Sequence, residues 1–232
     1  MKNRSKRYKE ILKTSVRDKK ISAKEILDLV KKNSTTKFDE SIDVSLRINL
    51  KQSKGGDLSL RTTVNLPNGS GKKSKVAVLC ETDKIDEAKK SGAEIVGSDD
   101  LIEKIASGKF NFDKLICTPG MMGKIGKHGK VLGPKGLMPN PKLGSVSDDV
   151  KQAVTDAKSG QAEIRNDKDG NIGVSIGKKS FHDDQLLKNY YTILDTLEKE
   201  KGNLTLKGDL IKNTFVTSSM GVSYKVKLGK VI

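Results

Sequence analysis

Side chains suited to hold phosphate groups are concentrated between Gly120 and Gly144, in the segment GMMGKIGKHGKVLGPKGLMPNPKLG. The segment carries five lysines and no acidic residue. Glycine lets a backbone approach a ligand closely, proline stiffens a loop, and lysine ammonium groups neutralise phosphates. We therefore expect a stiff loop that makes secondary contacts to phosphate groups; a long, rigid connection between two elements is the alternative, and one segment can be both. The lysines proposed for these contacts are Lys124, Lys127, Lys130 and Lys135.

Three shorter clusters combine hydrogen-bonding groups with an apolar side chain or a glycine. They are KFDES at residues 37–41, RNDK at 165–168 and SSMG at 218–221. A single aromatic residue such as Phe38, between a helix and a strand, belongs by default to a core, but beside Lys37 it is equally suited to pack under an RNA sugar or base. An antiparallel sheet is able to bring all three clusters to one edge.

Motifs for catalysis or cofactor binding are incomplete in this sequence. The loop NGSGKKS at residues 68–74 has Leu66 where a phosphate-binding loop needs Gly, and it precedes a strand rather than a helix. His128 and His182 have no catalytic partner nearby, and with Cys80 and Cys117 they make no metal-ligand spacing. We expect no enzyme, no cofactor, no metal site and two buried, reduced cysteines. The rival class is a nucleotide-dependent enzyme, which binding of ATP or NAD would support.

The net charge indicates a polyanionic partner. The 232-residue chain has 45 Lys and Arg against 29 Asp and Glu, a formal charge of +16 and a pI near 9.7. Nucleic acid is the first candidate and an anionic membrane surface the second. The alternative is that the positive charge reflects a generally basic proteome and no particular partner. Only six of the basic residues are Arg, the side chain that reads base edges, so the composition favours gripping a backbone shape over reading duplex DNA.

Hydropathy gives no sign of a membrane span or a secretory signal. No apolar run approaches the roughly 20 residues that a spanning helix needs, and the N-terminal MKNRSKRY has no apolar stretch behind it. We therefore expect a cytoplasmic protein.

The first third of the chain predicts two helices followed by two strands. Ser22 opens a capping-box pattern before an apolar helical face at residues 26–30, and apolar residues then alternate from Ile42 to Leu50. A turn at residues 54–57 (KGGD) is expected to lead into a return strand over residues 60–66.

The middle of the chain alternates short apolar runs with polar helices. Runs at residues 76–80, 93–96 and 115–118 are separated by helices over 83–91 and 99–108. Strands that alternate with helices indicate a parallel sheet with helices on its faces.

An antiparallel pattern returns after Gly160. Asp169-Gly170 predicts a hairpin between strands at 162–166 and 172–176, Ser180 is expected to cap a long helix, and two strands end the chain at about 214–218 and 222–228. Neither end of the chain offers enough strands to bury a core alone. We therefore expect residues 1–66 and 160–232 to form one discontinuous α+β domain. Residues 67–159 would be an inserted parallel α/β domain, with a two-stranded hinge at the crossings.

Four segments carry a resemblance to a known family. They are KFDE near position 40, GKVLGPKGLMPNPKLGSV at 129–146, EIRNDK at 163–168 and SMG at 219–221. In this order they resemble the ribosomal protein L-one family, from the mobile stalk of the large subunit beside the tRNA exit site. The resemblance covers nearly the whole chain. It implies a split β-α-β first domain with an inserted Rossmann-like second domain.

The same resemblance implies the partners. The first domain would bind folded large-subunit ribosomal RNA, and the protein, a monomer off the ribosome, would assist release of deacylated tRNA from the exit site. It would also repress translation of its own operon by binding the messenger RNA. A nonspecific basic nucleic-acid-binding protein is the alternative.

Carried over residue by residue, the family's RNA-contacting patch falls on three clusters and the N-terminus. Ser219 and Val222 stand where the family usually has Thr and often Pro, so the hydroxyl is kept while the rigidity of the turn is less certain. The implied RNA-binding residues are Arg4, Lys6, Arg7, Tyr8, Lys37, Phe38, Glu40, Ser41, Arg165, Asn166, Asp167, Lys168, Asn213, Ser219, Met220 and Gly221.

Overall fold

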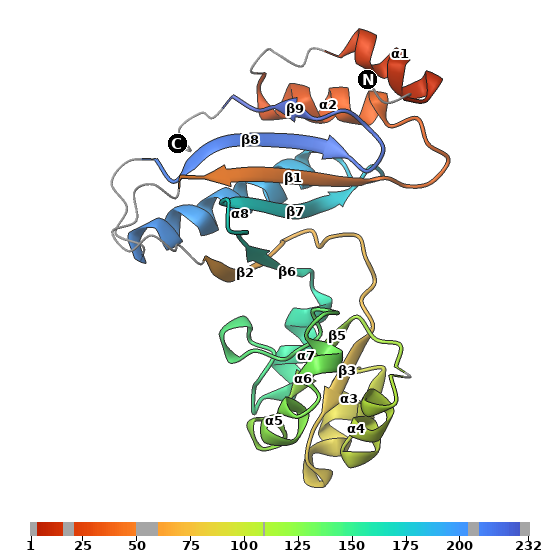
Figure 1. Ribbon diagram of the computed structural model, residues 1–232, viewed down its shortest axis with the longest axis vertical. Coiled ribbons are helices and arrows are strands. Elements are labelled where there is room, and N and C mark those ends of the chain that lie inside the picture. The colour runs from red at the N-terminus through yellow and green to blue at the C-terminus, as the bar shows by residue number, and fades with distance from the viewer. Residues whose placement is uncertain (1–3, 16–20, 50–59, 109, 204–208, 228–232) are drawn as a thin grey trace. The chain divides into compact units, whose positions relative to one another are not determined.

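The computed structural model describes residues 4–15, 21–49, 60–108, 110–203 and 209–227. The described residues form a mixed α/β protein (Figure 1), which confirms the predicted fold class. Their strands make a four-stranded antiparallel sheet, a two-stranded sheet and a three-stranded parallel sheet. The chain divides into two compact units, residues 1–71 with 162–232 and residues 72–161. That residues 67–159 are an inserted domain, and that the crossings form a hinge, stays a prediction.

The first unit is built on a sheet with the strand order β7-β1-β8-β9. β1 (Ser41–Ile48) lies between β7 (Asn171–Lys178) and β8 (Ile211–Ser218), antiparallel to both, and β9 (Tyr224–Lys225) completes the sheet. Residues of β1 alternate between buried and more exposed positions, as the sequence pattern predicted. One face of the sheet is therefore apolar and the other polar.

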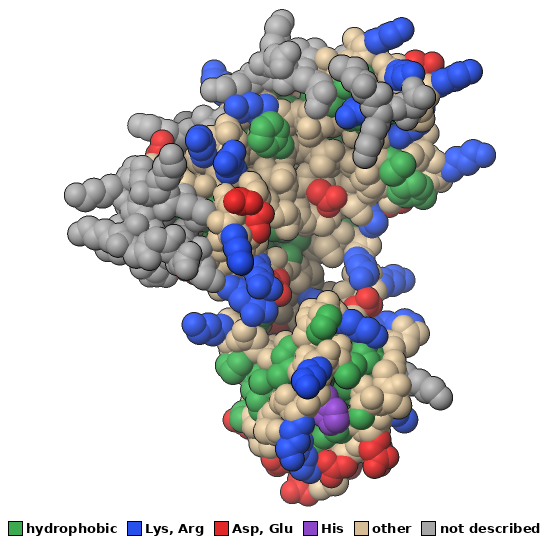
Figure 2. Space-filling view, viewed as in Figure 1, with side chains coloured by type: hydrophobic (Ala, Val, Ile, Leu, Met, Phe, Trp, Pro, Cys, Tyr) green, Lys and Arg blue, Asp and Glu red, His purple; other side chains and the backbone are tan. Residues whose placement is uncertain are grey.

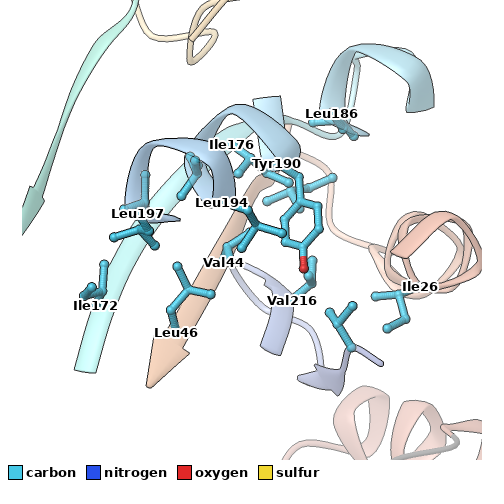
Figure 3. Close-up of a cluster of buried hydrophobic side chains, with 14 of the residues drawn as sticks. Ile26, Val44, Leu46, Ile172, Ile176, Leu186, Tyr190, Leu194, Leu197 and Val216 are labelled. Atoms are coloured by element: carbon cyan, nitrogen blue, oxygen red, sulfur yellow. The ribbon is translucent and has the colours of Figure 1, made fainter. Parts of the chain in front are cut away.

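The described residues of this unit form three helices: α1 (Lys6–Thr14), α2 (Ala23–Asn33) and α8 (Asp183–Asn203). The hydroxyl of Ser22 caps α2 by accepting a hydrogen bond from the backbone N–H of Glu25, as predicted. Figure 3 shows side chains of α8 meeting the apolar face of the sheet. Burial of each aliphatic side chain stabilises the fold by about 1.5–3 kcal/mol. The buried residues of this contact include Val44, Leu46, Ile172, Ile176, Leu186, Tyr190, Leu194, Leu197 and Val216.

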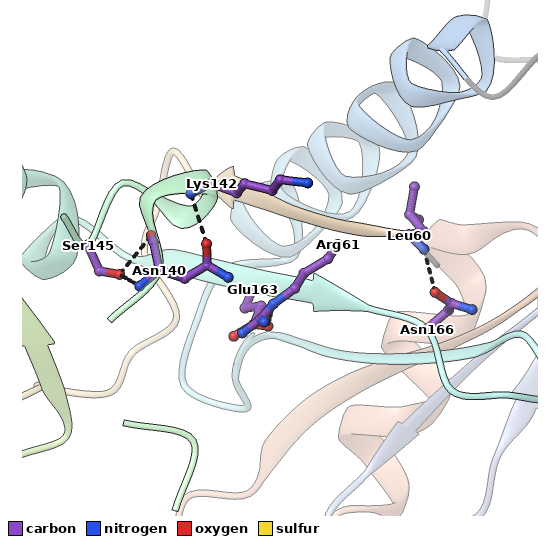
Figure 4. A network of polar contacts seen from close by, with 7 residues as sticks. All are labelled: Leu60, Arg61, Asn140, Lys142, Ser145, Glu163 and Asn166. Carbon is purple, nitrogen blue, oxygen red and sulfur yellow. Dashed lines mark hydrogen bonds and ion pairs between the residues drawn. The ribbon is translucent and has the colours of Figure 1, made fainter. Parts of the chain in front are cut away.

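The return strand pairs differently from the prediction. β2 (Arg61–Asn65) forms a two-stranded sheet with β6 (Gln161–Arg165), not with β1, whose two edges are already occupied by β7 and β8. Asn166 fixes this pairing, because its Oδ1 accepts from the backbone N–H of Leu60 at 2.6 Å (Figure 4). The predicted turn at 54–57 lies outside the described residues.

The predicted turn at Asp169-Gly170 and the strands on either side of it are confirmed, but the pairing of these two strands as a hairpin is wrong. Gly170 takes a left-handed conformation (φ +79°), and the backbone N–H of Asp167 donates to the carbonyl of Asn171 at 2.9 Å. β6 and β7 then enter different sheets, and a single bridge between Asn166 and Ile172 joins them beyond the turn.

Two polar contacts around α8 were not predicted from the sequence. Ser180 does not cap the helix, because its hydroxyl and backbone N–H both donate to the carboxylate of Asp39 at 2.8 and 3.1 Å. Buried Asn189 donates to the carbonyls of Gly69 and Ile176 at 2.9 and 2.8 Å, and its Oδ1 accepts from the N–H of Asn68. The segment entering the second unit is thus tied to α8 as far as Gly69.

The second unit contains the predicted parallel sheet, in the order β4-β3-β5. Because residues of the central strand point alternately to the two faces, it supports two separate apolar cores. One core lies against α4, α5 and α6, and the other against α3 and α7. The elements are β3 (Val76–Leu79), η2 (Thr82–Lys84), α3 (Ile85–Lys90), β4 (Ile95–Gly97), α4 (Asp99–Ala106), β5 (Lys114–Cys117), α5 (Pro119–Gly126), α6 (Gly129–Leu132), η3 (Pro141–Leu143) and α7 (Val150–Lys158).

Two features of this unit differ from the expectations set by the sequence. The segment 120–144 is not one stiff loop, because Met121, Ile125 and Leu132 are buried against the sheet and the chain around them forms α5 and α6. Helix α7 was not predicted. It is capped by Asp149 and buries Val150, Ala153, Val154 and Ala157, an i, i+3, i+4, i+7 pattern.

Both cysteines are free and buried, as expected. Burial raises the pKa of the Cys117 thiol to about 11. Because the thiolate is the reactive species, neither thiol should react with Ellman's reagent within minutes at pH 8 in the folded protein. Both should react at once in denaturant. Rapid labelling of the native protein would contradict this burial.

None of the helices in the described ranges is long and apolar enough to cross a membrane.

Candidate RNA interface

The first and third polar clusters meet where β1 begins and β8 ends. The backbone N–H of Ser41 donates to Oγ of Ser219 at 3.0 Å, and the N–H of Ser219 donates to the carbonyl of Ser41 at 3.0 Å. The two residues are 178 positions apart in the chain. The antiparallel pairing of β1 with β8 therefore continues into the loops and holds them together.

Glu40 links these two loops from the inside. Its side chain is fully buried, and its Oε1 accepts from the hydroxyl of Thr36 at 2.8 Å. Its Oε2 accepts from the backbone N–H of Met220 at 3.0 Å. One carboxylate thus fixes the turn that carries Phe38 and the turn that carries Met220.

Hydrogen bonds keep this carboxylate ionised. Burial on its own raises the pKa of Glu40, but the bonds donated by Met220 and Thr36 outweigh burial and hold it below its ordinary value. A depressed pKa contributes stability above the unfolded-state pKa, about 4.3, and this contribution is lost as the pH falls through the folded-state pKa. At neutral pH the contribution is fully present.

Two large apolar side chains protrude from this framework. Phe38 is 55% exposed and Met220 is 51% exposed, which resolves the choice between core and surface for Phe38. Gly221 follows Met220 without room for a side chain, because a Cβ there would lie 2.3 Å from Oγ of Ser218. Exposed apolar groups on a fixed turn are typical of contact surfaces.

Basic side chains surround the protruding pair. Arg7 of α1 donates to the carbonyl of Met220 at 2.6 Å and to the hydroxyl of Thr35 at 3.3 Å. Lys178 of β7 donates to Oγ of Ser41 at 2.8 Å. The Arg4 guanidinium lies 4.7 Å from the ring centroid of Tyr8. Helix α1 is thus anchored to the site through Arg7. Lys6 is the first residue of α1 and Arg4 lies just before the helix, and both side chains are exposed.

The second cluster does not join the other two. Residue 47 of β1 pairs with Asn171 and with Asn213, whereas residue 41 pairs with Lys178. The turn that carries 165–168 therefore lies at the opposite end of β1, about 20 Å away at roughly 3.4 Å per residue. Asn213 also lies at that far end.

Within the second cluster, Asp167 organises the turn. Its carboxylate accepts from the side chain and backbone N–H of Asn171 and from the N–H of Asp169, and these bonds lower its pKa. Arg165 and Lys168 are exposed on either side of it, while Asn166 is occupied with Leu60.

The lysines of the second unit are not equivalent. Lys124 forms an ion pair with Asp99 of α4 at 2.7 Å, although its own segment contains no acid. The ammonium group of Lys135 lies 4.2 Å from the ring centroid of Phe110. Lys127 and Lys130 are exposed. Asn140 and Ser145 brace the same segment, since the N–H of Asn140 donates to Oγ of Ser145 at 2.7 Å (Figure 4).

Sequence reasoning missed three residues of the main site. Thr36, four positions before Glu40, is the one that a local hydrogen-bond motif could have indicated. Thr35 and Lys178 reach the site only through the fold, so their neighbours in sequence gave no signal.

Known proteins are similar in sequence to this chain over nearly its full length. A family model described as "Ribosomal protein L1p/L10e family" matches residues 30–222. A protein of Pelagibacter ubique described as "Large ribosomal subunit protein uL1" is 77% identical over 207 residues, 89% of this chain and 90% of the relative. A protein of Lactiplantibacillus plantarum with the same description is 44% identical over 228 residues, 98% of this chain and 99% of the relative.

Proposed function

The chain belongs to the Ribosomal protein L1p/L10e family, and on that premise we propose that it is a component of the large ribosomal subunit. In this role it binds folded large-subunit ribosomal RNA through its first unit. Membership of a ribosomal protein family also agrees with the expectation that the chain is not an enzyme.

One observation carries the proposed binding site. Phe38 and Met220 are more than half exposed, yet both stand on turns that the buried carboxylate of Glu40 holds together. A contact surface that is rigid before binding loses little conformational entropy when its partner arrives. The pair is suited to stack on RNA bases and pack on sugars, while Arg7 and Lys37 neutralise phosphates.

Within this site, Glu40 and Ser41 are given different roles. Glu40 is a positioning residue, because its oxygens accept hydrogen bonds from inside the protein and its side chain is fully buried. Oγ of Ser41 accepts from Lys178, so its own hydroxyl proton is available to a second partner. Ser41 would therefore donate to an acceptor on the RNA, such as a 2′-oxygen or a phosphate oxygen.

The test is competition for a labelled fragment of the large-subunit stalk RNA. Unlabelled stalk RNA is expected to displace the label at concentrations at least a hundredfold below those of bulk tRNA or duplex DNA. Equal competition by all three would favour a nonspecific basic nucleic-acid-binding protein and would overturn the proposal.

The lysines of the second unit are predicted to differ in their contribution to binding. Each phosphate that the protein no longer neutralises should reduce the slope of log K against log salt concentration by about 0.7–0.9. Replacing Lys127 or Lys130 with Ala should therefore flatten the slope more than Lys124→Ala, because Lys124 already pairs with Asp99. Binding titrations over a series of KCl concentrations would measure this. An equal change for all three variants, or none, would contradict it.

Two finer roles are part of the proposal: assistance to release of deacylated tRNA from the exit site, and repression of the protein's own operon through its messenger RNA. For the first, ribosomes lacking the protein should release exit-site tRNA more slowly in a chase experiment. For the second, the operon's leader RNA should compete with stalk RNA for one site, and Met220→Asp should weaken both.

A further inference from the structure

The connection between β7 and α8 holds the loop that carries Phe38. Its Lys179 donates a backbone N–H to the carbonyl of Glu40 at 2.8 Å. Its Ser180 donates twice to the carboxylate of Asp39, at 2.8 and 3.1 Å. The connection is therefore part of the framework of the RNA site, although none of its residues was among those implied for RNA binding.

Lys178, the last residue of β7, touches two parts of the first unit at once. Its ammonium group donates to Oγ of Ser41, the hydroxyl that we propose donates to RNA, at 2.8 Å. The methylene stem of the same side chain lies against Gly71, because a Cβ on Gly71 would come within 2.7 Å of Cγ of Lys178. Residue 71 is the last residue of the first unit before the chain crosses to the second. One side chain therefore connects the first crossing to the RNA site.

The backbone at Gly71 has no room for a side chain. Its φ of +73° lies in the left-handed region, and an added Cβ would also come within 3.1 Å of the Phe181 ring. Phe181 is held in place, because its ring packs against the core and its carbonyl accepts from the ammonium group of Lys31. A change in the backbone at Gly71 therefore displaces the flexible stem of Lys178 first.

We propose that Lys178 is a positioning residue through which the conformation of the first crossing at Gly71 sets the affinity of the RNA site. While the crossing keeps this conformation, the stem is held and the ammonium group fixes the hydroxyl of Ser41. A donor that is fixed before binding loses less conformational entropy than a free one. This inference rests on the proposed function and deepens it, because it adds a means of regulating the same site.

Gly71→Ala tests the connection from the side of the crossing. The variant keeps every charge, so it should lose at least fivefold in affinity for stalk RNA without a change in the salt slope. Gly108→Ala in the second unit is the matched control, because Gly108 has nearly the same φ, +72°, and an added Cβ there would meet nothing within 4 Å. The control should stay within twofold of the wild type.

Lys178→Met tests the connection from the side of the RNA site and introduces no strain at Gly71. It keeps an apolar stem and removes the ammonium group, and it should also lose at least fivefold in affinity. Figure 2 shows Lys and Arg side chains at many places on this face of the first unit, so removing one also lowers the general attraction to RNA. Lys188→Met, at an exposed position of α8, measures that general term and should stay within twofold.

The double variant separates positioning from other causes. If the connection runs through Lys178, Gly71→Ala should cost no more than twofold when added to Lys178→Met, because the contact is already broken. The salt slope of Lys178→Met should also fall no further than that of Lys188→Met, since a positioning residue neutralises no phosphate.

Three outcomes would overturn the inference: wild-type affinity in either single variant, an equal cost of Gly71→Ala in both backgrounds, or equal losses in a variant and its control. In each case a large loss in Met220→Asp would leave the proposed function standing. Failure of the wild-type protein to prefer stalk RNA over bulk tRNA would instead overturn the proposed function itself.

Discussion

Met220→Asp is expected to weaken binding of stalk ribosomal RNA at least thirtyfold, or about 2 kcal/mol. Met220 is 51% exposed on a turn whose backbone is held by Glu40 and Arg7, so its side chain is available for contact with RNA and is not part of the protein core. A carboxylate at this position would replace an apolar contact with repulsion toward phosphates. Filter binding or calorimetry at one fixed salt concentration would measure the loss.

Met220→Leu is the control for the Met220→Asp prediction. Leu keeps an apolar side chain of similar volume, and its affinity should lie within about threefold of the wild type. Because neither variant removes a buried contact, both should unfold at the same denaturant concentration as the wild type. If Met220→Asp bound stalk RNA normally, the assignment of the site would be wrong.

Glu40→Ala should lower both stability and affinity. The change removes the acceptor of the Met220 N–H and the nearer of the two acceptors of the Thr36 hydroxyl, whose other acceptor is the Phe38 carbonyl at 3.2 Å; a group left unsatisfied costs about 1–3 kcal/mol. We expect a loss of about 2–4 kcal/mol in the free energy of unfolding of the first unit and a tenfold or greater loss of RNA affinity. Urea unfolding and RNA titration would measure the two effects.

Two further measurements distinguish positioning from direct contact for Glu40. The amide of Met220 should exchange with solvent much faster in Glu40→Ala, because its acceptor is gone. Glu40→Gln keeps one acceptor oxygen and should give intermediate values. A variant that lost affinity but kept the stability and amide protection of the wild type would mean that Glu40 touches RNA directly.

Much of the fold could be predicted because single segments carry their own signals. The alternation from Ile42 to Ile48 and the cap at Ser22 depend on neighbours a few residues away, and both were confirmed. The predicted pairing of β2 with β1 was wrong, because pairing depends on which strand edges are free and β7 and β8 occupy both edges of β1. Edge occupancy is decided by residues more than a hundred positions later.

The segment 120–144 shows a different limit. Its glycines and prolines predicted a loop, because both residue types have poor helix propensity. Burial of Met121 and Ile125 against the parallel sheet outweighs this low propensity and stabilises α5. The site shows the same limit, because the clusters could be recognised while their distances could not. The register of β7 on β1 sends the RNDK cluster to the far end of the strand.

The two halves of the proposed site are synthesised far apart in time, because they lie far apart in the sequence. Ser41 and Ser219 lie 178 residues apart, and β1 is flanked by two strands that follow it by more than a hundred residues. A nascent chain that has not yet exposed Met220 outside the ribosome's exit tunnel therefore lacks both the sheet and the turn that present the site. A chain that stops before Met220 therefore lacks the proposed site and would not compete with longer chains for the RNA.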